Sequence, residues 1–321
     1  MYTIFLRLCA VFLMIGMGWL ARRTGLLDGE ATRRLARLQT QILYPALIFT
    51  AIAGSFTLSS LGANWALPAG AFAIMLVGFL TGLLIRPFLA LKEPAAARGF
   101  LFQCTINNYS YLPMPLALFF WGETGVAALM FSTLGSEAAV WTLGVCAMTG
   151  DRLSGASLRR LLNVPLLAIV ASVATLAVRA AAQAWWPQFS PPGALRQLAE
   201  TGFSALEFMG RATIPLAMIT VGSRMSELRP AGLVNRLQAA IALLRLIVIP
   251  GLAILLLSLA PLPATTRAVL ILVAVMPSAN ASVVLSELYG GDVRLAAGAI
   301  LVTHAFCLVT VPLWLHHFAG V

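Results

Sequence analysis

Two apolar segments, about 170 residues apart, are each interrupted near the middle by asparagine and proline. The first, residues 103–115, reads QCTINNYSYLPMP, and the second, residues 273–282, reads VAVMPSANAS. Proline has no amide hydrogen, so each interruption frees backbone carbonyls and begins a new half-helix with unpaired N–H groups. Such helix N-termini favour anions, and asparagine and serine side chains donate hydrogen bonds without burying a formal charge. The two segments therefore predict a binding site for an anion such as a carboxylate.

The expected binding residues are those that interrupt the two segments: Asn107, Asn108, Tyr109, Pro113, Pro115, Pro277, Ser278, Asn280 and Ser282. Pro277, for example, leaves the carbonyl of Val273 without its helical donor. The alternative interpretation is that each proline only kinks its helix, while neighbouring side chains repair the backbone. The clustered asparagines in both segments favour the binding site.

The composition predicts that these segments lie in a membrane. The 321 residues are 60% hydrophobic and 10% charged, and the mean hydropathy is +0.92. Apolar stretches long enough to cross a hydrocarbon core of about 30 Å recur along the chain, and a break in such a span must line a cavity or be buried in protein. We expect an all-α integral membrane protein with ten transmembrane helices, at 2–21, 36–54, 65–89, 97–120, 125–148, 162–184, 202–222, 235–258, 266–288 and 294–315.

The basic residues predict the orientation in the membrane. Fifteen of the 21 Lys and Arg fall in alternate connections, at 22–37, 86–98, 152–160, 224–236 and Arg294. Cytoplasmic loops carry such an excess of basic residues, so both termini are expected on the outer, periplasmic side. The net charge of +10 therefore orients the chain in the bilayer and is not interpreted as a nucleic-acid surface.

Similar features in the two halves predict an inverted repeat. Pro45 and Pro215 lie 170 positions apart, in segments without polar neighbours, where a simple kink is the favoured interpretation. Because five spans is an odd number, a second copy must run inverted relative to the first. We expect two five-helix repeats, residues 1–155 and 156–321, joined near the basic connection 151–160. The two broken spans would then face each other near the bilayer midplane, where transporters with such repeats bind substrate.

Several ionisable residues lie inside predicted spans, where each charge needs a physical reason. Glu137 and His304 occupy nearly equivalent places in the two halves, and either could bind and release a proton during a transport cycle. The alternative is a hydrogen-bonded, protonated Glu137 and a satisfied core histidine. Arg245 has no acidic neighbour in sequence and is expected to pair with Glu137 or to meet an anionic substrate. Glu207 and Arg211, four residues apart, are expected to pair with each other.

The motifs NNYSYLPMP at 107–115, MPSAN at 276–280 and ELYGGD at 287–292 resemble those of the auxin efflux carrier family, including its bacterial malonate and malate permease branch. The resemblance implies a bile acid/sodium symporter-like inverted-repeat fold in which broken helices 4 and 9 cross. It also implies a scaffold of spans 1, 2, 6 and 7 that forms a homodimer, and an elevator-like or rocking core of spans 3–5 and 8–10. Substrate contacts implied by the resemblance are Asn107, Pro113, Pro277 and Asn280. The Gly-rich first motif of many plant members is replaced here by Asn-Asn-Tyr-Ser-Tyr, which favours a substrate smaller than auxin.

Missing motifs narrow the classes of function. The chain has no GxxxxGK[ST] phosphate-binding loop and no HExxH, and its YGGD sequence falls one residue short of the GxGD of intramembrane aspartyl proteases. The four cysteines all fall inside predicted spans without metal-ligand spacing, so no metal or cofactor is expected. We therefore expect a non-enzymatic secondary transporter of a small organic anion in the plasma (bacterial inner) membrane, facilitative or coupled to protons or Na⁺. The alternative is a transporter-like sensor that binds its ligand without moving it.

Overall fold

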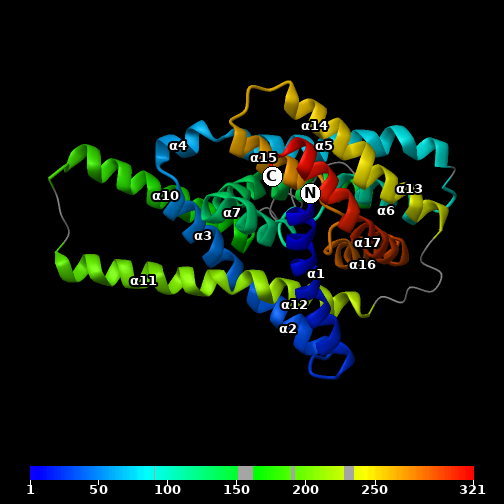
Figure 1. Ribbon diagram of the computed structural model, residues 1–321, viewed down its shortest axis with the longest axis horizontal. Helices are drawn as coiled ribbons and strands as arrows, with labels where there is room; N and C mark the ends of the chain where they lie inside the picture. Colours follow the sequence, from blue (N-terminus) through cyan, green and yellow to red (C-terminus); the bar gives the residue numbers. More distant parts are fainter. Residues whose placement is uncertain (90, 151–161, 189–191, 228–234) are drawn as a thin grey trace.

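The computed structural model describes residues 1–89, 91–150, 162–188, 192–227 and 235–321, and within these ranges the regular structure is helical (Figure 1). The expected seam at 151–160 lies outside the described residues. The described helices are α1 (Tyr2–Arg23), α2 (Gly29–Leu38), α3 (Tyr44–Ser55), α4 (Leu58–Ala63), α5 (Ala66–Ile85), α6 (Pro94–Thr105), α7 (Pro113–Ala139), α8 (Val145–Thr149), α10 (Val164–Trp185), α11 (Gly193–Arg211), α12 (Thr213–Met225), α13 (Arg236–Leu243), α14 (Ile249–Ser258), α15 (Ala264–Ala274), α16 (Ser282–Tyr289) and α17 (Val293–Phe318).

Among the described residues, six helical stretches are long and apolar enough to cross a membrane, which makes this a multi-pass membrane protein. They are Tyr2–Arg23, Leu58–Leu89, Pro113–Thr149, Val164–Trp185, Arg236–Ser258 and Val293–Phe318. The other four expected spans are each divided between consecutive helices: α2 and α3, α6 and α7, α11 and α12, and α15 and α16. In α7 the chain also turns at Gly122, whose positive φ of 61° suits a residue without a side chain. This turn lies between the expected spans 97–120 and 125–148.

Prolines account for several of the divisions. A π-helical turn, η1 (Gln39–Leu43), precedes Pro45 at the start of α3, and another, η4 (Leu244–Val248), precedes Pro250 at the start of α14. Pro250 cannot donate to the carbonyl of Leu246, and the indole Nε1 of Trp314 on α17 donates to that oxygen at 2.8 Å. A side chain from another helix therefore replaces the missing backbone donor, as buried backbone in a membrane requires.

Helices α1 and α12 are in close contact where they cross, while α10 and α11 extend from the body as an arm (Figure 1). The close packing depends on Gly18 and Gly222, because a Cβ at either position would overlap the backbone carbonyl of Ile219 or Ile15 on the opposite helix. Small residues at such contacts let membrane helices approach each other. At the polar end of the pair, Arg22 pairs with Glu227 at 2.8 Å, and Thr32 on α2 bonds Ser223 on α12 at 2.7 Å.

Gly18→Ala is expected to destabilise the protein, because the new methyl group must displace the backbone of α12. Overpacking of this kind typically costs about 1–3 kcal/mol, whereas alanine otherwise favours a helix over glycine by about 1 kcal/mol. Gly16→Ala is the matched control, since the same helix has open space at Gly16. Thermal unfolding in detergent should give a lower midpoint for Gly18→Ala and an unchanged or higher midpoint for Gly16→Ala. Equal midpoints for the two variants would contradict the close approach.

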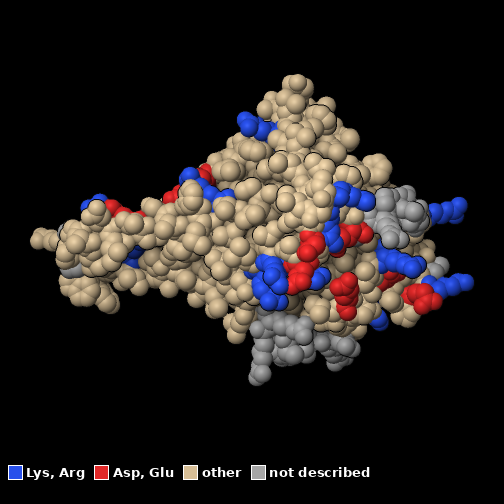
Figure 2. Space-filling view, turned by 90° about the horizontal axis from the view of Figure 1, so that it is seen from below, with Lys and Arg blue, Asp and Glu red and all other residues tan. Residues whose placement is uncertain are grey.

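Charged side chains gather over the broad body of the molecule and are sparse along most of the arm (Figure 2). Asp28, in the connection before α2, accepts a hydrogen bond from the amide of Ala31 at 2.6 Å and caps that helix. This hydrogen bond lowers the pKa of the Asp28 carboxyl below its usual value. The amino group of Met1 lies 3.3 Å from Nδ1 of His316, so the start of α1 and the end of α17 are adjacent.

Candidate functional site

The two interrupted segments predicted from the sequence lie against each other. Asn107 and Ser278 form an antiparallel bridge, and the amide of Asn108 donates to the carbonyl of Pro277 at 2.8 Å. The amide of Ser278 donates to Oγ1 of Thr303 on α17 at 3.2 Å. The breaks after α6 and α15 therefore bond to each other, in a contact called the crossing below, and to α17.

The carbonyl that Pro277 leaves free finds a donor across this crossing. Nδ2 of Asn107 donates to the carbonyl of Val273 at 2.5 Å, and the Asn107 side chain is completely buried. Oδ1 of Asn108 accepts a long hydrogen bond of 3.4 Å from the amide of Leu112, the residue that precedes α7. These two asparagines bond to the backbone of the crossing and do not line the cavity described next.

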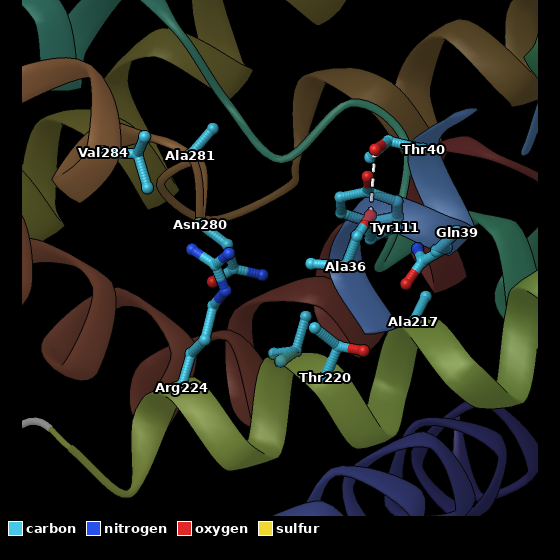
Figure 3. A pocket seen from close by; sticks show the side chains of 11 residues that line it. Ala36, Gln39, Thr40, Tyr111, Ala217, Thr220, Arg224, Asn280, Ala281 and Val284 are labelled. Atoms are coloured by element: carbon cyan, nitrogen blue, oxygen red, sulfur yellow. Dashed lines mark hydrogen bonds between the residues drawn. The ribbon is translucent and has the colours of Figure 1, made fainter. Parts of the chain in front are cut away.

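A cavity of about 190 Å³ lies beside the crossing, between α12, η1 and the start of α16 (Figure 3). Its polar lining comes from Gln39, Thr40, Tyr111, Thr220, Arg224 and Asn280. A smaller cavity of about 70 Å³ adjoins it and is also lined by Arg224 and Asn280. The side chain of Arg224 extends from α12 toward Asn280 in Figure 3. The two cavities thus separate α12 from the second broken segment.

The electrostatic character of the larger cavity is positive. Arg224 is half-buried and forms no salt bridge with any acidic group in the described ranges. Asn280 and Ala281 line the cavity just before α16 begins, so the positive end of this helix dipole faces the space. Tyr111 lies just before α7, but prolines at 113 and 115 and the bond from the Met114 amide to the Ser110 carbonyl leave the first turn of α7 without a free donor. Nδ2 of Asn280 is buried and has no hydrogen-bond partner among the described residues. A guanidinium, an amide donor and the N-terminus of α16 make this a site suited to an anion.

Of the binding residues predicted from the sequence, Asn280 alone is among the residues that line this cavity. Pro113 and Pro115 are buried at the start of α7, Pro277 and Ser278 belong to the crossing, Ser282 is buried in α16, and Tyr109 bonds Glu137. Arg224 is not among the binding residues predicted from the sequence, where it belongs to the basic connection 224–236. In the structure Arg224 lies in the last turn of α12. The sequence signal that could have identified Arg224 is its position only two residues after the predicted end of span 7 at residue 222.

The candidate coupling residues Glu137, His304 and Arg245 each bond to different partners. The carboxylate of Glu137 accepts hydrogen bonds from the hydroxyl of Tyr109 at 2.7 Å, Nδ2 of Asn163 at 2.9 Å and Nε1 of Trp141 at 3.0 Å. His304 is fully buried, with Nδ1 2.8 Å from the carbonyl of Ile300 and Nε2 without a partner among the described residues.

Arg245 is fully buried and donates to the carbonyls of Cys104 and Ala274. Glu207 and Arg211 pair at 2.8 Å, as expected from their spacing. In the part of the chain that the structure describes, no three His, Cys, Asp or Glu side chains are placed to hold a metal ion.

A multi-pass helical protein with a polar cavity beside two broken helices falls in the class of membrane transporters. Comparison with known proteins agrees: the family described as membrane transport protein matches residues 3–156 and again residues 153–315. The chain therefore belongs to this family, which is of the auxin efflux carrier type, as the sequence motifs indicated. It is also 27% identical to the uncharacterised transporter MJ1031 of Methanocaldococcus jannaschii over 311 residues, which is 95% of each chain. Membership of a transporter family indicates transport and not catalysis.

Proposed function

We propose that the protein is a secondary carrier of a small organic anion, and that the substrate binds in the cavity between α12 and the crossing. The observation that carries this proposal is the combination of Arg224, Asn280 and the N-terminus of α16 around one space. A carboxylate there can accept hydrogen bonds from the guanidinium of Arg224 and from the amide of Asn280. Charge-assisted hydrogen bonds of this kind are about twice as strong as those between neutral groups.

The size of the cavity favours a short substrate. The main cavity has a volume of about 190 Å³ and the adjoining one about 70 Å³. A mono- or dicarboxylate such as malonate or malate fits a space of this size. The departure of residues 107–111 from the Gly-rich motif also favours a small acid.

The proposed architecture is two inverted five-helix repeats, residues 1–155 and 156–321, with crossed broken helices 4 and 9. Two observations support it: the family model matches the chain twice, and the two breaks run antiparallel where Asn107 meets Ser278. In an elevator-type cycle, a core of spans 3–5 and 8–10 would move against a scaffold of spans 1, 2, 6 and 7. The cavity lies between these parts, because α12 belongs to span 7 and Asn280 to span 9.

The scaffold is also the proposed homodimer interface. Large apolar side chains are exposed along the arm, including Leu195, Leu198 and Phe208 on α11.

We place the protein in the plasma (bacterial inner) membrane with both termini on the outer, periplasmic side, since the basic connections indicate the cytoplasmic face.

For coupling we favour a proton, with Glu137 as its binding group and His304 as the second candidate. Glu137 connects Tyr109 in the crossing with Asn163, which caps the start of α10 by accepting from the amide of Leu166. Protonation of this carboxyl would weaken hydrogen bonds between the core and span 6 of the scaffold. A change in charge at Glu137 would therefore favour movement of one part against the other.

Uptake of radiolabelled malonate, malate and auxin into proteoliposomes tests the proposal directly. We expect saturable uptake of one short acid, faster when an inward proton gradient is imposed. Glu137→Gln removes the titrating group. Its amide oxygen can still accept from Nε1 of Trp141 and Nδ2 of Asn163, and its NH₂ can donate to the hydroxyl of Tyr109. This variant should retain binding and lose the effect of the gradient. Ligand-induced thermal stabilisation without uptake of any acid would instead favour the sensor, and neither binding nor uptake would contradict the proposed substrate class.

A further inference from the structure

Arg245 is one of the largest side chains that the structure buries completely. It lies in the π-helical turn η4 (Leu244–Val248), between α13 and α14. Nη1 donates to the carbonyl of Cys104 at 3.0 Å, and Nη2 donates to the carbonyl of Ala274 at 3.2 Å. One guanidinium therefore joins two segments that are 170 residues apart in sequence.

Both carbonyls belong to helix ends created by the breaks. Cys104 is in the last turn of α6, and Ala274 is the last residue of α15. In a continuous helix they would accept from the amides of Asn108 and Ser278. Those amides instead donate to the carbonyl of Pro277 and to Oγ1 of Thr303. The crossing thus diverts the normal donor at each helix end, and Arg245 replaces both.

The helix ends explain how a charged side chain is tolerated here. Among the described residues no carboxylate forms a salt bridge with Arg245, but the C-terminal ends of two helices carry negative partial charge. The planar guanidinium can donate to two carbonyls at once, which a single-point ammonium cannot do as well. Converging helix C-termini with free carbonyls are also the kind of site at which carriers coordinate Na⁺.

We propose that Arg245 is a positioning residue that acts as a built-in cation: it fixes the two half-helices against each other and occupies the place that a bound Na⁺ would otherwise take. This inference rests on the proposed carrier function. It makes the geometry of the crossing, and hence of the adjacent anion cavity, independent of Na⁺. The substrate does not meet Arg245, since this side chain is not among those that line the cavity.

The test compares thermal unfolding of the purified protein in NaCl and in choline chloride at equal ionic strength. The wild type should have the same midpoint in both salts. In choline chloride, Arg245→Met should unfold about 5–10 °C below the wild type, because two charge-assisted hydrogen bonds are lost. Adding Na⁺ should raise the midpoint of this variant part of the way back, and the increase should saturate with Na⁺ concentration. Arg245→Lys keeps the charge and should lose less stability, without responding to Na⁺.

Arg179→Met is the matched control. Arg179 also donates to a carbonyl in the last turn of a helix, that of Ala53 in α3, at 2.8 Å. Within the described ranges it makes no such bond to a second helix end. This variant should lose stability without gaining a response to Na⁺. If Arg245→Met does not fold, Arg245→Gln serves as the neutral variant, because its side chain still carries an amide donor.

Two results would overturn the proposal: a saturable response of the wild type to Na⁺, or equal midpoints in the two salts for the neutral variants. Neither measurement uses substrate. Failure of the uptake experiment would therefore leave the thermal comparison valid, and the reverse also holds.

Discussion

Replacing Arg224 by glutamine should abolish saturable uptake of the anionic substrate at concentrations near the wild-type Kd. Loss of one charge-assisted interaction is worth about 1.5–3 kcal/mol, which raises Kd roughly 10- to 100-fold. The side chain is half-buried and has no acidic partner in the described part of the chain, so its removal leaves no charge buried alone. Thermal stability without ligand should therefore change little. Titration of malonate or malate followed by calorimetry gives the change in Kd.

Arg23→Gln is the control for Arg224→Gln. Arg23 lies at the polar end of α1, which packs against α12, and its guanidinium is 5.2 Å from the centre of the Trp19 ring, away from the cavity lining. This variant removes the same charge and should keep wild-type affinity. Arg224→Lys should be intermediate, because it keeps the charge but loses the planar pair of donors. Equal affinity of Arg224→Gln and the wild type would place the substrate elsewhere.

The second large effect is expected on stability, for Asn107→Ala. This change leaves the buried carbonyl of Val273 without the donor that replaces the missing amide of Pro277. An unsatisfied buried polar group costs about 1–3 kcal/mol, and the cost falls directly on the contact between the two breaks. We expect a clearly lower unfolding midpoint, together with loss of uptake, because the N-termini of α7 and α16 would no longer be held beside the cavity.

The neighbouring variant Asn108→Ala separates this effect from general damage to the segment. Its side chain makes a long hydrogen bond of 3.4 Å to the amide of Leu112, so a smaller decrease in the midpoint is expected. Thermal unfolding of both variants in the same detergent measures the difference. If Asn108→Ala were the less stable of the two, the side chain of Asn107 would not be the main contact that holds the crossing.

Local sequence signals were sufficient for several features of the protein. Hydropathy predicted an all-helical membrane protein, because a span needs about 20 apolar residues and this requirement is local. The prolines and asparagines at 107–115 and 277–280 predicted where helices stop, because proline has no amide hydrogen to donate to the carbonyl four residues before it. The same motifs indicated the family that the comparisons then showed. The i,i+4 spacing of Glu207 and Arg211 predicted their ion pair.

The partners of the unusual residues were decided only by the tertiary structure. That the free carbonyl of Val273 meets Asn107, that Arg245 joins α6 to α15, and that Arg224 lies beside Asn280 all depend on contacts between segments distant in sequence. From the sequence, a lone arginine near the end of a span is assigned to the adjoining loop, because sequence spacing carries no information about which helices pack together. The proline breaks determined by the sequence created groups that needed partners, and the packing of the helices decided which side chains supplied them.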